Sequence, residues 1–72
     1  MQPSKWSNDY LIRKEVYLSN NTVWVIRADG WRLSLGTDAG YADASWVGDA
    51  VVITFKSGWR IRYYSQYECE NL

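Results

Sequence analysis

Residues 51–62, with the sequence VVITFKSGWRIR, decide the fold of this chain. An apolar run precedes a turn that ends in Gly58, and alternating aliphatic and basic residues follow it, which is typical of a β-hairpin. A two-residue loop ending in Gly58 would place Phe55 on the same face as Arg60. A three-residue loop with a left-handed Gly58 instead pairs Phe55 with Trp59 and leaves one face wholly apolar. We therefore predict the three-residue loop, with Ile53 opposite Ile61 and Val51 opposite Tyr63.

Residues 23–33, with the sequence VWVIRADGWRL, align without gaps to residues 51–61. Both stretches contain an apolar run, a turn that ends in glycine, and then Trp, Arg and an aliphatic residue. Because hairpins converge readily on such patterns, we interpret the similarity as one local rule used twice. The first hairpin is therefore predicted to have the same three-residue loop.

This loop decides which side chains of the first hairpin face the core, since a one-residue slip reverses every side chain of a strand. The three-residue loop directs one set inward: Val23, Val25, Trp31, Leu33 and Leu35. It directs the other set outward: Trp24, Ile26, Arg32 and Ser34. A two-residue Asp29-Gly30 turn is the alternative, and it would bury Trp24 with Ile26 and Leu33. In the preferred register Trp31 and Trp59 are predicted to anchor the core, with arginines lying over their rings.

Turn residues divide the chain into short runs rich in β-branched and aromatic residues. Five runs are predicted as strands: Tyr10–Leu18, Thr22–Arg27, Trp31–Leu35, Val51–Phe55 and Trp59–Tyr64. Residues 36–49, rich in Gly, Ala and Asp, are predicted to form a long loop, with room for a short strand or helical turn around Tyr41–Trp46. Residues 1–8 are predicted to be flexible. The tail 65–72 is expected to form a short strand, a docking segment or a frayed end.

These elements predict one small all-β domain, mostly antiparallel, over residues 1–72. Five strands joined by short turns fit a half-open barrel, Src-homology-3-like or OB-like in shape. A curled meander sheet completed by dimerisation is the alternative. Aromatic residues make up 17% of the chain. Because each buries roughly 150–250 Å², we expect them to supply much of the core of so short a chain.

Composition narrows the range of functions. Eight basic and eight acidic residues give a formal net charge of zero, whereas a general nucleic-acid binder normally carries a basic excess. Without histidine, Ser-His-Asp and Cys-His catalytic sets and mixed Cys/His zinc sites are excluded. Cys69, the one cysteine, lies between two glutamates that disfavour its thiolate. We expect no cofactor, no metal and no membrane partner, and a cytoplasmic location because no export signal or apolar span is recognised.

Asp38, Asp43 and Asp49 are the candidates for a cation site or a pair of catalytic carboxylates. Their spacing does not match the alternating acidic pattern of a calcium-binding loop. We expect them to be solvated turn carboxylates, because Asp commonly serves turns. A small enzyme that uses this segment is the weakest of the three functional hypotheses.

Arginine and aromatic residues form the remaining candidate site. The predicted partner-binding residues are Trp24, Arg32, Arg60, Arg62 and Tyr64. The three arginines are expected to project from one sheet face, where like charges require an acidic group such as Glu15 or an external partner. The leading hypothesis is a non-enzymatic module that binds another protein and self-associates into a homodimer, since Arg, Trp and Tyr are enriched at binding hot spots. Small β proteins of this kind occur among phage and mobile-element accessory proteins. The alternative is a barrel that binds single-stranded nucleic acid.

Overall fold

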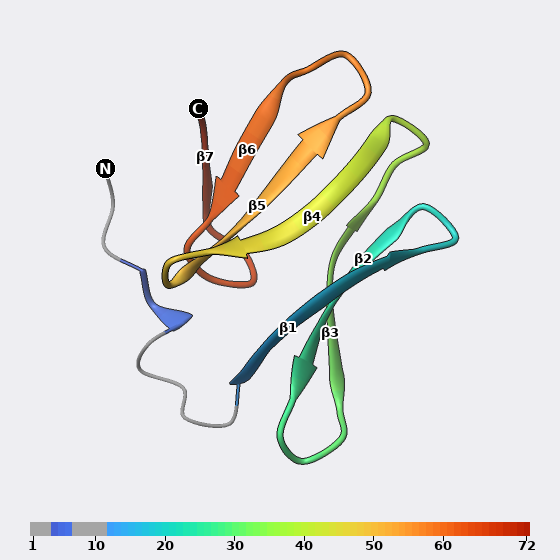
Figure 1. Ribbon diagram of the computed structural model, residues 1–72. Helices are drawn as coiled ribbons and strands as arrows, with labels where there is room; N and C mark the ends of the chain where they lie inside the picture. Colours follow the sequence, from blue (N-terminus) through green and yellow to red (C-terminus); the bar gives the residue numbers. More distant parts are fainter. Residues whose placement is uncertain (1–3, 7–11) are drawn as a thin grey trace.

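A computed structural model describes residues 4–6 and 12–72, with side chains from residue 15 onward in the second range (Figure 1). The described residues form seven antiparallel strands: β1 Ile12–Ser19, β2 Thr22–Arg27, β3 Arg32–Thr37, β4 Tyr41–Val47, β5 Ala50–Phe55, β6 Arg60–Tyr63 and β7 Cys69–Asn71. They make a three-stranded sheet in the order β1-β2-β3 and a four-stranded sheet in the order β4-β5-β6-β7. The all-β antiparallel class is confirmed.

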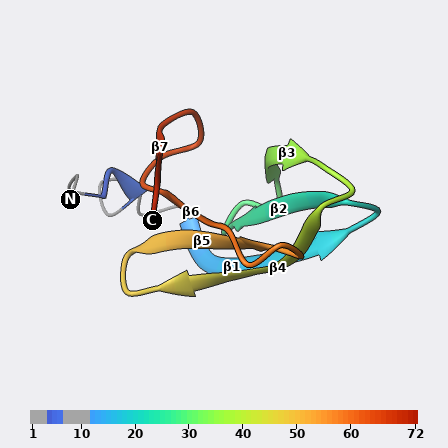
Figure 2. The same cartoon turned by 90° about the horizontal axis from the view of Figure 1, so that it is seen from above.

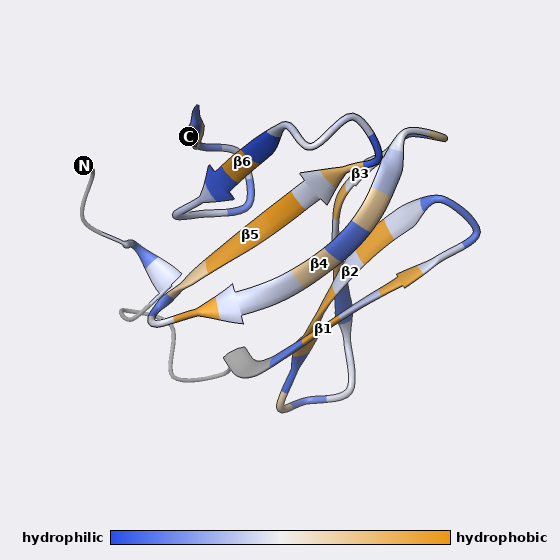
Figure 3. Cartoon of the chain, turned by 45° about the horizontal axis from the view of Figure 1, so that its top comes forward, coloured by the Kyte–Doolittle hydropathy of each residue, from blue (hydrophilic) through white to orange (hydrophobic). Residues whose placement is uncertain are grey.

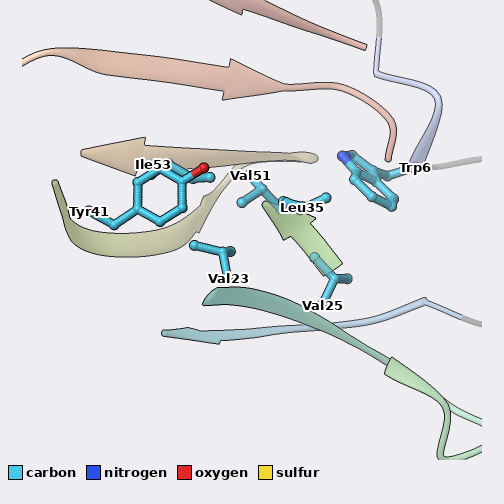
Figure 4. Packing of buried hydrophobic residues seen from close by; sticks show 7 residues of the cluster. All are labelled: Trp6, Val23, Val25, Leu35, Tyr41, Val51 and Ile53. Carbon is cyan, nitrogen blue, oxygen red and sulfur yellow. The ribbon is translucent and has the colours of Figure 1, made fainter. Parts of the chain in front are cut away.

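The core lies between the two sheets. β5 is the most hydrophobic strand (Figure 3), and its inward side chains face those of β2 (Figure 4). Val23, Val25, Val51 and Ile53 are fully buried there. Alternation along each strand sends every second side chain to this interior, so the residues that the hairpin registers direct inward supply the core.

Both sheets contain the same three-stranded meander. Each residue of β1-β2-β3 corresponds to the residue 28 positions later in β4-β5-β6, as Val23 corresponds to Val51. Glu15 pairs with Ile26 after a bulge, and Asp43 pairs with Thr54 after a bulge at the matching place. The correspondence therefore extends beyond the two hairpins recognised in the sequence to three strands, two turns and one bulge. It ends beyond Ser34, where a further bulge pairs Val23 with Gly36, whereas Val51 pairs with Tyr63.

The loops of both hairpins are as predicted. Val51 pairs with Tyr63, and Ile53 with Ile61. Val25 pairs with Leu33, which rules out the two-residue turn in the first hairpin. Gly30 and Gly58 close the two loops at φ angles of 91° and 93°, in the left-handed region that glycine adopts without a steric penalty.

The number of strands and their division into two sheets differ from the prediction. Seven described strands replace the expected five, and they form two sheets rather than one half-open barrel or one curled sheet. β1 lies alongside β4 without pairing to it (Figure 2). Half of the predicted long loop 36–49 is β4, which lies where the sequence left room for a short strand, because β5 supplies a pairing partner that overrides its weak β propensity. The tail contributes β7, one of the three outcomes expected for it.

Residues 4–6 pack against the four-stranded sheet. Trp6 is only 6% exposed, its ring makes an edge contact with that of Trp46 at 5.7 Å, and its Nε1 donates to the Tyr63 carbonyl at 2.9 Å. Nζ of Lys5 lies 2.6 Å from a carboxylate oxygen of Glu68. The expectation of a flexible terminus is therefore wrong for these residues. The rest of residues 1–8, and Tyr10 and Leu11 of the first predicted strand, lie outside the described residues.

The predicted burial of Trp31 and Trp59 is wrong. Their side chains are 73% and 55% exposed. Both continue the inward face of their strands, but each stands at a hairpin tip, and the two tips point to opposite ends of the molecule (Figure 1). At the second tip, the Trp59 ring lies beside that of Phe55, with ring centroids 6.3 Å apart.

Candidate functional site

The outer face of the three-stranded sheet brings arginine and aromatic side chains together. We call it the Trp24–Arg32 face. Its members are Glu15 and Tyr17 from β1, Trp24 and Ile26 from β2, and Arg32 and Ser34 from β3. They share one face because the observed register places them at alternate positions, opposite the buried Val23 and Val25.

Arg32 and Trp24 form the centre of this face. The guanidinium carbon of Arg32 lies 4.6 Å from the centroid of the Trp24 ring, within the range of a cation–π contact. An Nη atom of Arg32 also donates to the Tyr17 hydroxyl at 2.7 Å. A guanidinium has five N–H donors, so the contact with Tyr17 leaves donors for an external carboxylate. Arg32 is exposed, and its planar group is held ready for such an acceptor.

A crevice adjoins the Trp24–Arg32 face where β1 runs beside β4. Its volume is about 490 Å³, and it is lined by Glu15, Val16, Tyr17, Ile26, Ala44, Ser45 and Trp46. Among the described residues, the Nε1 atom of Trp46 is buried and has no hydrogen-bond partner. The crevice is open and largely apolar, which suits contact with a protruding side chain better than enclosure of a small molecule.

The tip of the β2–β3 hairpin carries a second hollow next to Arg32. Exposed Trp31 stands beside a shallow hollow of about 320 Å³ lined by Arg27, Asp29, Trp31, Arg32 and Leu33. An Nη atom of Arg27 lies 3.0 Å from a carboxylate oxygen of Asp29. This hydrogen-bonded ion pair lowers the pKa of Asp29, and the Trp31 backbone N–H that Asp29 accepts acts in the same direction. The tip is thus an ordered turn that presents a large apolar ring.

The other predicted site residues lie on the second sheet. The three arginines do not share one face, because Arg32 belongs to β3 and the other two to β6. Arg60 is exposed. Arg62 is only 7% exposed; one Nη lies 3.4 Å from Glu70 and the other 4.0 Å from Asp49. Its guanidinium carbon also lies 5.8 Å from the ring centroid of Tyr64, so Arg62 and Tyr64 are brought together as part of the fold.

Of the three candidate carboxylates, Asp43 lies within β4, and Asp38 and Asp49 lie beyond its two ends. Asp38 accepts from the Gly40 N–H at 2.6 Å in the turn before this strand, and Asp49 lies after its other end. A seven-residue strand is roughly 20 Å long, so the two do not form a pair. The parts of the chain that the structure describes contain no group of three or more His, Cys, Asp or Glu side chains placed to hold a metal ion. No helix long and apolar enough to cross a membrane occurs in those parts.

Sequence reasoning missed Tyr17 and the crevice. Residues of β1 alternate in type, so Tyr17 could have been assigned to the outer face once the β1–β2 register was known. The crevice depends on how β1 sits beside β4, a contact between strands that are not paired. No local pattern in the sequence encodes that arrangement.

Comparisons of the chain with protein-family models, with curated proteins and with solved structures found no match. Its function must therefore be inferred from the geometry of its own surfaces.

Proposed function

We propose that this chain is a non-enzymatic module that binds another protein through the Trp24–Arg32 face. The observation that carries the proposal is the exposed Arg32 guanidinium, stacked on Trp24 and hydrogen-bonded to Tyr17. Tryptophan, tyrosine and arginine are the residues most enriched at the energetic centres of protein interfaces. Here they occur as one preorganised cluster, which reduces the entropy lost on binding.

The surroundings of this cluster support the proposal. The adjoining crevice of about 490 Å³ offers a recess for a partner side chain, and exposed Trp31 enlarges the apolar area at the hairpin tip. The zero net charge favours a protein partner over phosphate backbones, because phosphate neutralisation dominates general nucleic-acid affinity. A partner with a carboxylate for Arg32 and an apolar group for the crevice fits this surface.

Capture from a nuclease-treated lysate of the source organism tests the proposal. The immobilised chain is compared with a Trp24→Ala/Arg32→Ala double variant and with an Arg60→Ala control, which removes the counterpart of Arg32 in the second meander. We expect the wild type and the control to retain the same protein. The double variant should bind the purified partner at least roughly 30-fold more weakly, the usual loss at a hot spot. Equal affinity of the double variant, with unchanged thermal unfolding, would show that the partner binds elsewhere.

Binding of single-stranded nucleic acid is the second candidate. The specific observation in its favour is Trp31, 73% exposed beside Arg32, because an exposed ring next to arginine can stack on a base. In that case nuclease treatment should abolish capture, and affinity for an oligonucleotide should fall log-linearly with salt. Retention of a second copy of the chain instead, together with dimer-sized sedimentation, would assign the face to self-association.

A further inference from the structure

β3 is an edge of the three-stranded sheet, and its outer side pairs with no strand among the described residues. Figure 1 shows β3 at the rim of this sheet. Edge strands present unpaired backbone groups that can pair with another chain. The exposed positions of β3 near the hairpin are Arg32 and Ser34.

The hydrogen-bond alternation identifies which backbone groups point outward. The Arg27 N–H donates to the Trp31 carbonyl at 2.9 Å, so near the hairpin Trp31, which precedes β3, and Leu33 within it are the residues that bond to β2. In an antiparallel ladder the intervening residues point their N–H and C=O groups to the opposite side. Those residues are Arg32 and Ser34. Nε2 of Gln66 lies 3.5 Å from the Ser34 carbonyl, at the outer limit for a hydrogen bond.

The second meander shows what such an edge accepts. Arg60 and Arg62 of β6 correspond to Arg32 and Ser34, and their outward side is covered by β7. The Leu72 N–H donates to the Arg60 carbonyl at 3.0 Å, and Arg62 is paired with Glu70. The strand that covers β6 is therefore short, extended and acidic. β3 has the same backbone arrangement as far as Ser34, beyond which a bulge pairs Gly36 with Val23, and no such strand covers it among the described residues.

Charge and shape at β3 point to a similar occupant. The exposed Arg32 keeps unused donors after its bond to Tyr17, so a carboxylate on a neighbouring strand would be complementary. The hollow lined by Arg27, Asp29, Trp31, Arg32 and Leu33 lies at the hairpin end of β3. It offers space for a side chain on the opposite face of the added strand.

We propose that β3 binds an extended acidic segment of the partner protein as a fourth strand, in the manner in which β7 binds β6. This inference rests on the proposed function and specifies its binding mode, known as β-augmentation. Backbone pairing to Arg32 and Ser34 fixes the register of the added strand, and a carboxylate next to Arg32 supplies charge complementarity. The incoming backbone replaces the 3.5 Å contact between Gln66 and the Ser34 carbonyl.

The test uses a probe derived from β7. The peptide YESENL, which is residues 67–72 with Cys69→Ser, is titrated into isotopically labelled chain while backbone amide resonances are followed by NMR. Saturable shifts should appear at residues 32–35. The matched peptide YQSQNL, which lacks both carboxylates, should bind roughly two- to fivefold more weakly, the usual range for an exposed ion pair. Shifts confined to residues 60–63, where the peptide would compete with β7, or no saturable shift at millimolar peptide, would overturn the proposal.

Two variants separate this inference from the proposed function. Ser34→Pro removes the outward N–H without removing a bond to β2, whereas Ser34→Ala keeps that N–H. We expect Ser34→Pro to abolish the peptide-induced shifts and to weaken partner capture, and Ser34→Ala to do neither. If capture survives Ser34→Pro but is lost in Trp24→Ala/Arg32→Ala, strand addition is wrong and the binding face stands. If capture survives both, the proposed function itself fails.

Discussion

The two meanders share a register as far as Ser34, where a bulge pairs Val23 with Gly36 in the first meander only, and they differ in what covers them. The second meander, β4-β5-β6, is extended by β7 and contacted by residues 4–6, and its Arg62 is buried between Asp49 and Glu70. The first meander, β1-β2-β3, has neither addition among the described residues. Its Arg32 stands exposed on Trp24.

The same three-stranded meander is therefore reinforced by other segments in one half of the molecule and leaves an arginine exposed in the other half. Reinforcement of the second meander supplies nonlocal contacts that a chain of 72 residues needs for a stable fold. Because those contacts hold the scaffold, the outer face and edge of the first meander are free to present arginine and aromatic groups. Variants in the two halves test this division between a scaffold half and a proposed binding half.

Removal of Trp6 should cause the largest loss of stability. Its ring is buried against Trp46, and its Nε1 bonds to Tyr63, so Trp6→Ala leaves both a cavity and an unpaired carbonyl. We expect a loss of about 3 kcal/mol in the free energy of unfolding measured with urea. The control Trp31→Ala should change it by less than about 0.5 kcal/mol, because that side chain is on the surface. Equal losses would contradict the assignment of the two tryptophans to different roles.

Arg62 should contribute to the free energy of unfolding, whereas the two exposed arginines, Arg32 and Arg60, should not. Arg62→Ala leaves Glu70 and Asp49 without their shared cation, and we expect a loss of about 1–2 kcal/mol. This is less than for a fully buried pair, because the side chains of Asp49 and Glu70 are 53% and 29% exposed. Arg32→Ala and Arg60→Ala should each change stability by less than about 0.5 kcal/mol. Chemical denaturation of the three variants distinguishes these outcomes.

Gly30 and Gly58 should be equally sensitive to substitution, because the two loops share one geometry. Both have positive φ angles, and a Cβ would meet no neighbouring atom within 4 Å at either position. The cost of alanine is therefore backbone strain alone, about 1 kcal/mol at each site. Thermal unfolding of Gly30→Ala and Gly58→Ala checks this equality. A markedly smaller loss at Gly30 would mean that the first loop adopts another conformation.

A change of pH should have the smallest effect on the stability of the fold. Burial, followed by the nearby Cys69, raises the pKa of Tyr63 to about 12 from an ordinary value of 10. The folded state then retains a proton that the unfolded state loses, so stability falls as pH rises from about 10 to about 12. Tyr63→Phe should reduce this alkaline loss, as measured by unfolding at a series of pH values. Its counterpart in the first meander is Leu35, which has no proton to lose.

The lengths of the hairpin loops could be predicted from the sequence because they depend on neighbouring residues. The loops that end in Gly30 and Gly58, and the faces that follow from them, depend on a few adjacent residues. Alternation selected the three-residue loop at Gly58, whereas at Gly30 it was preferred over a two-residue Asp29-Gly30 turn, which the structure rules out. Burial at the hairpin tips could not be predicted in this way. Trp31 and Trp59 lie on the correct face of their strands, but their exposure depends on how far the opposite sheet extends.

The features that local patterns did not indicate depend on pairing and packing with other segments. The sequence left a short strand around Tyr41–Trp46 only as one option, because β4 is poor in β-branched residues and forms by pairing with β5. Trp6 has no neighbouring apolar pattern, and its place against Trp46 is set by the tertiary fold. Likewise, the sequence placed Arg62 with Arg32 and Arg60 as a candidate binding residue, because nothing near it indicates that Glu70 and Asp49 will enclose it.

Hydrogen exchange at the backbone N–H groups of Ser34 and Arg62 tests whether the edge of β3 is open while the edge of β6 is covered. These residues are counterparts whose N–H groups point away from β2 and β5 respectively, and only the edge that carries Arg62 is covered by a strand among the described residues. We expect fast hydrogen exchange at the Ser34 N–H and strong protection of the Arg62 N–H in the free protein. Protection of Ser34 equal to that of Arg62 would show that the edge of β3 is already covered, and the distinction between an open and a reinforced half would be wrong.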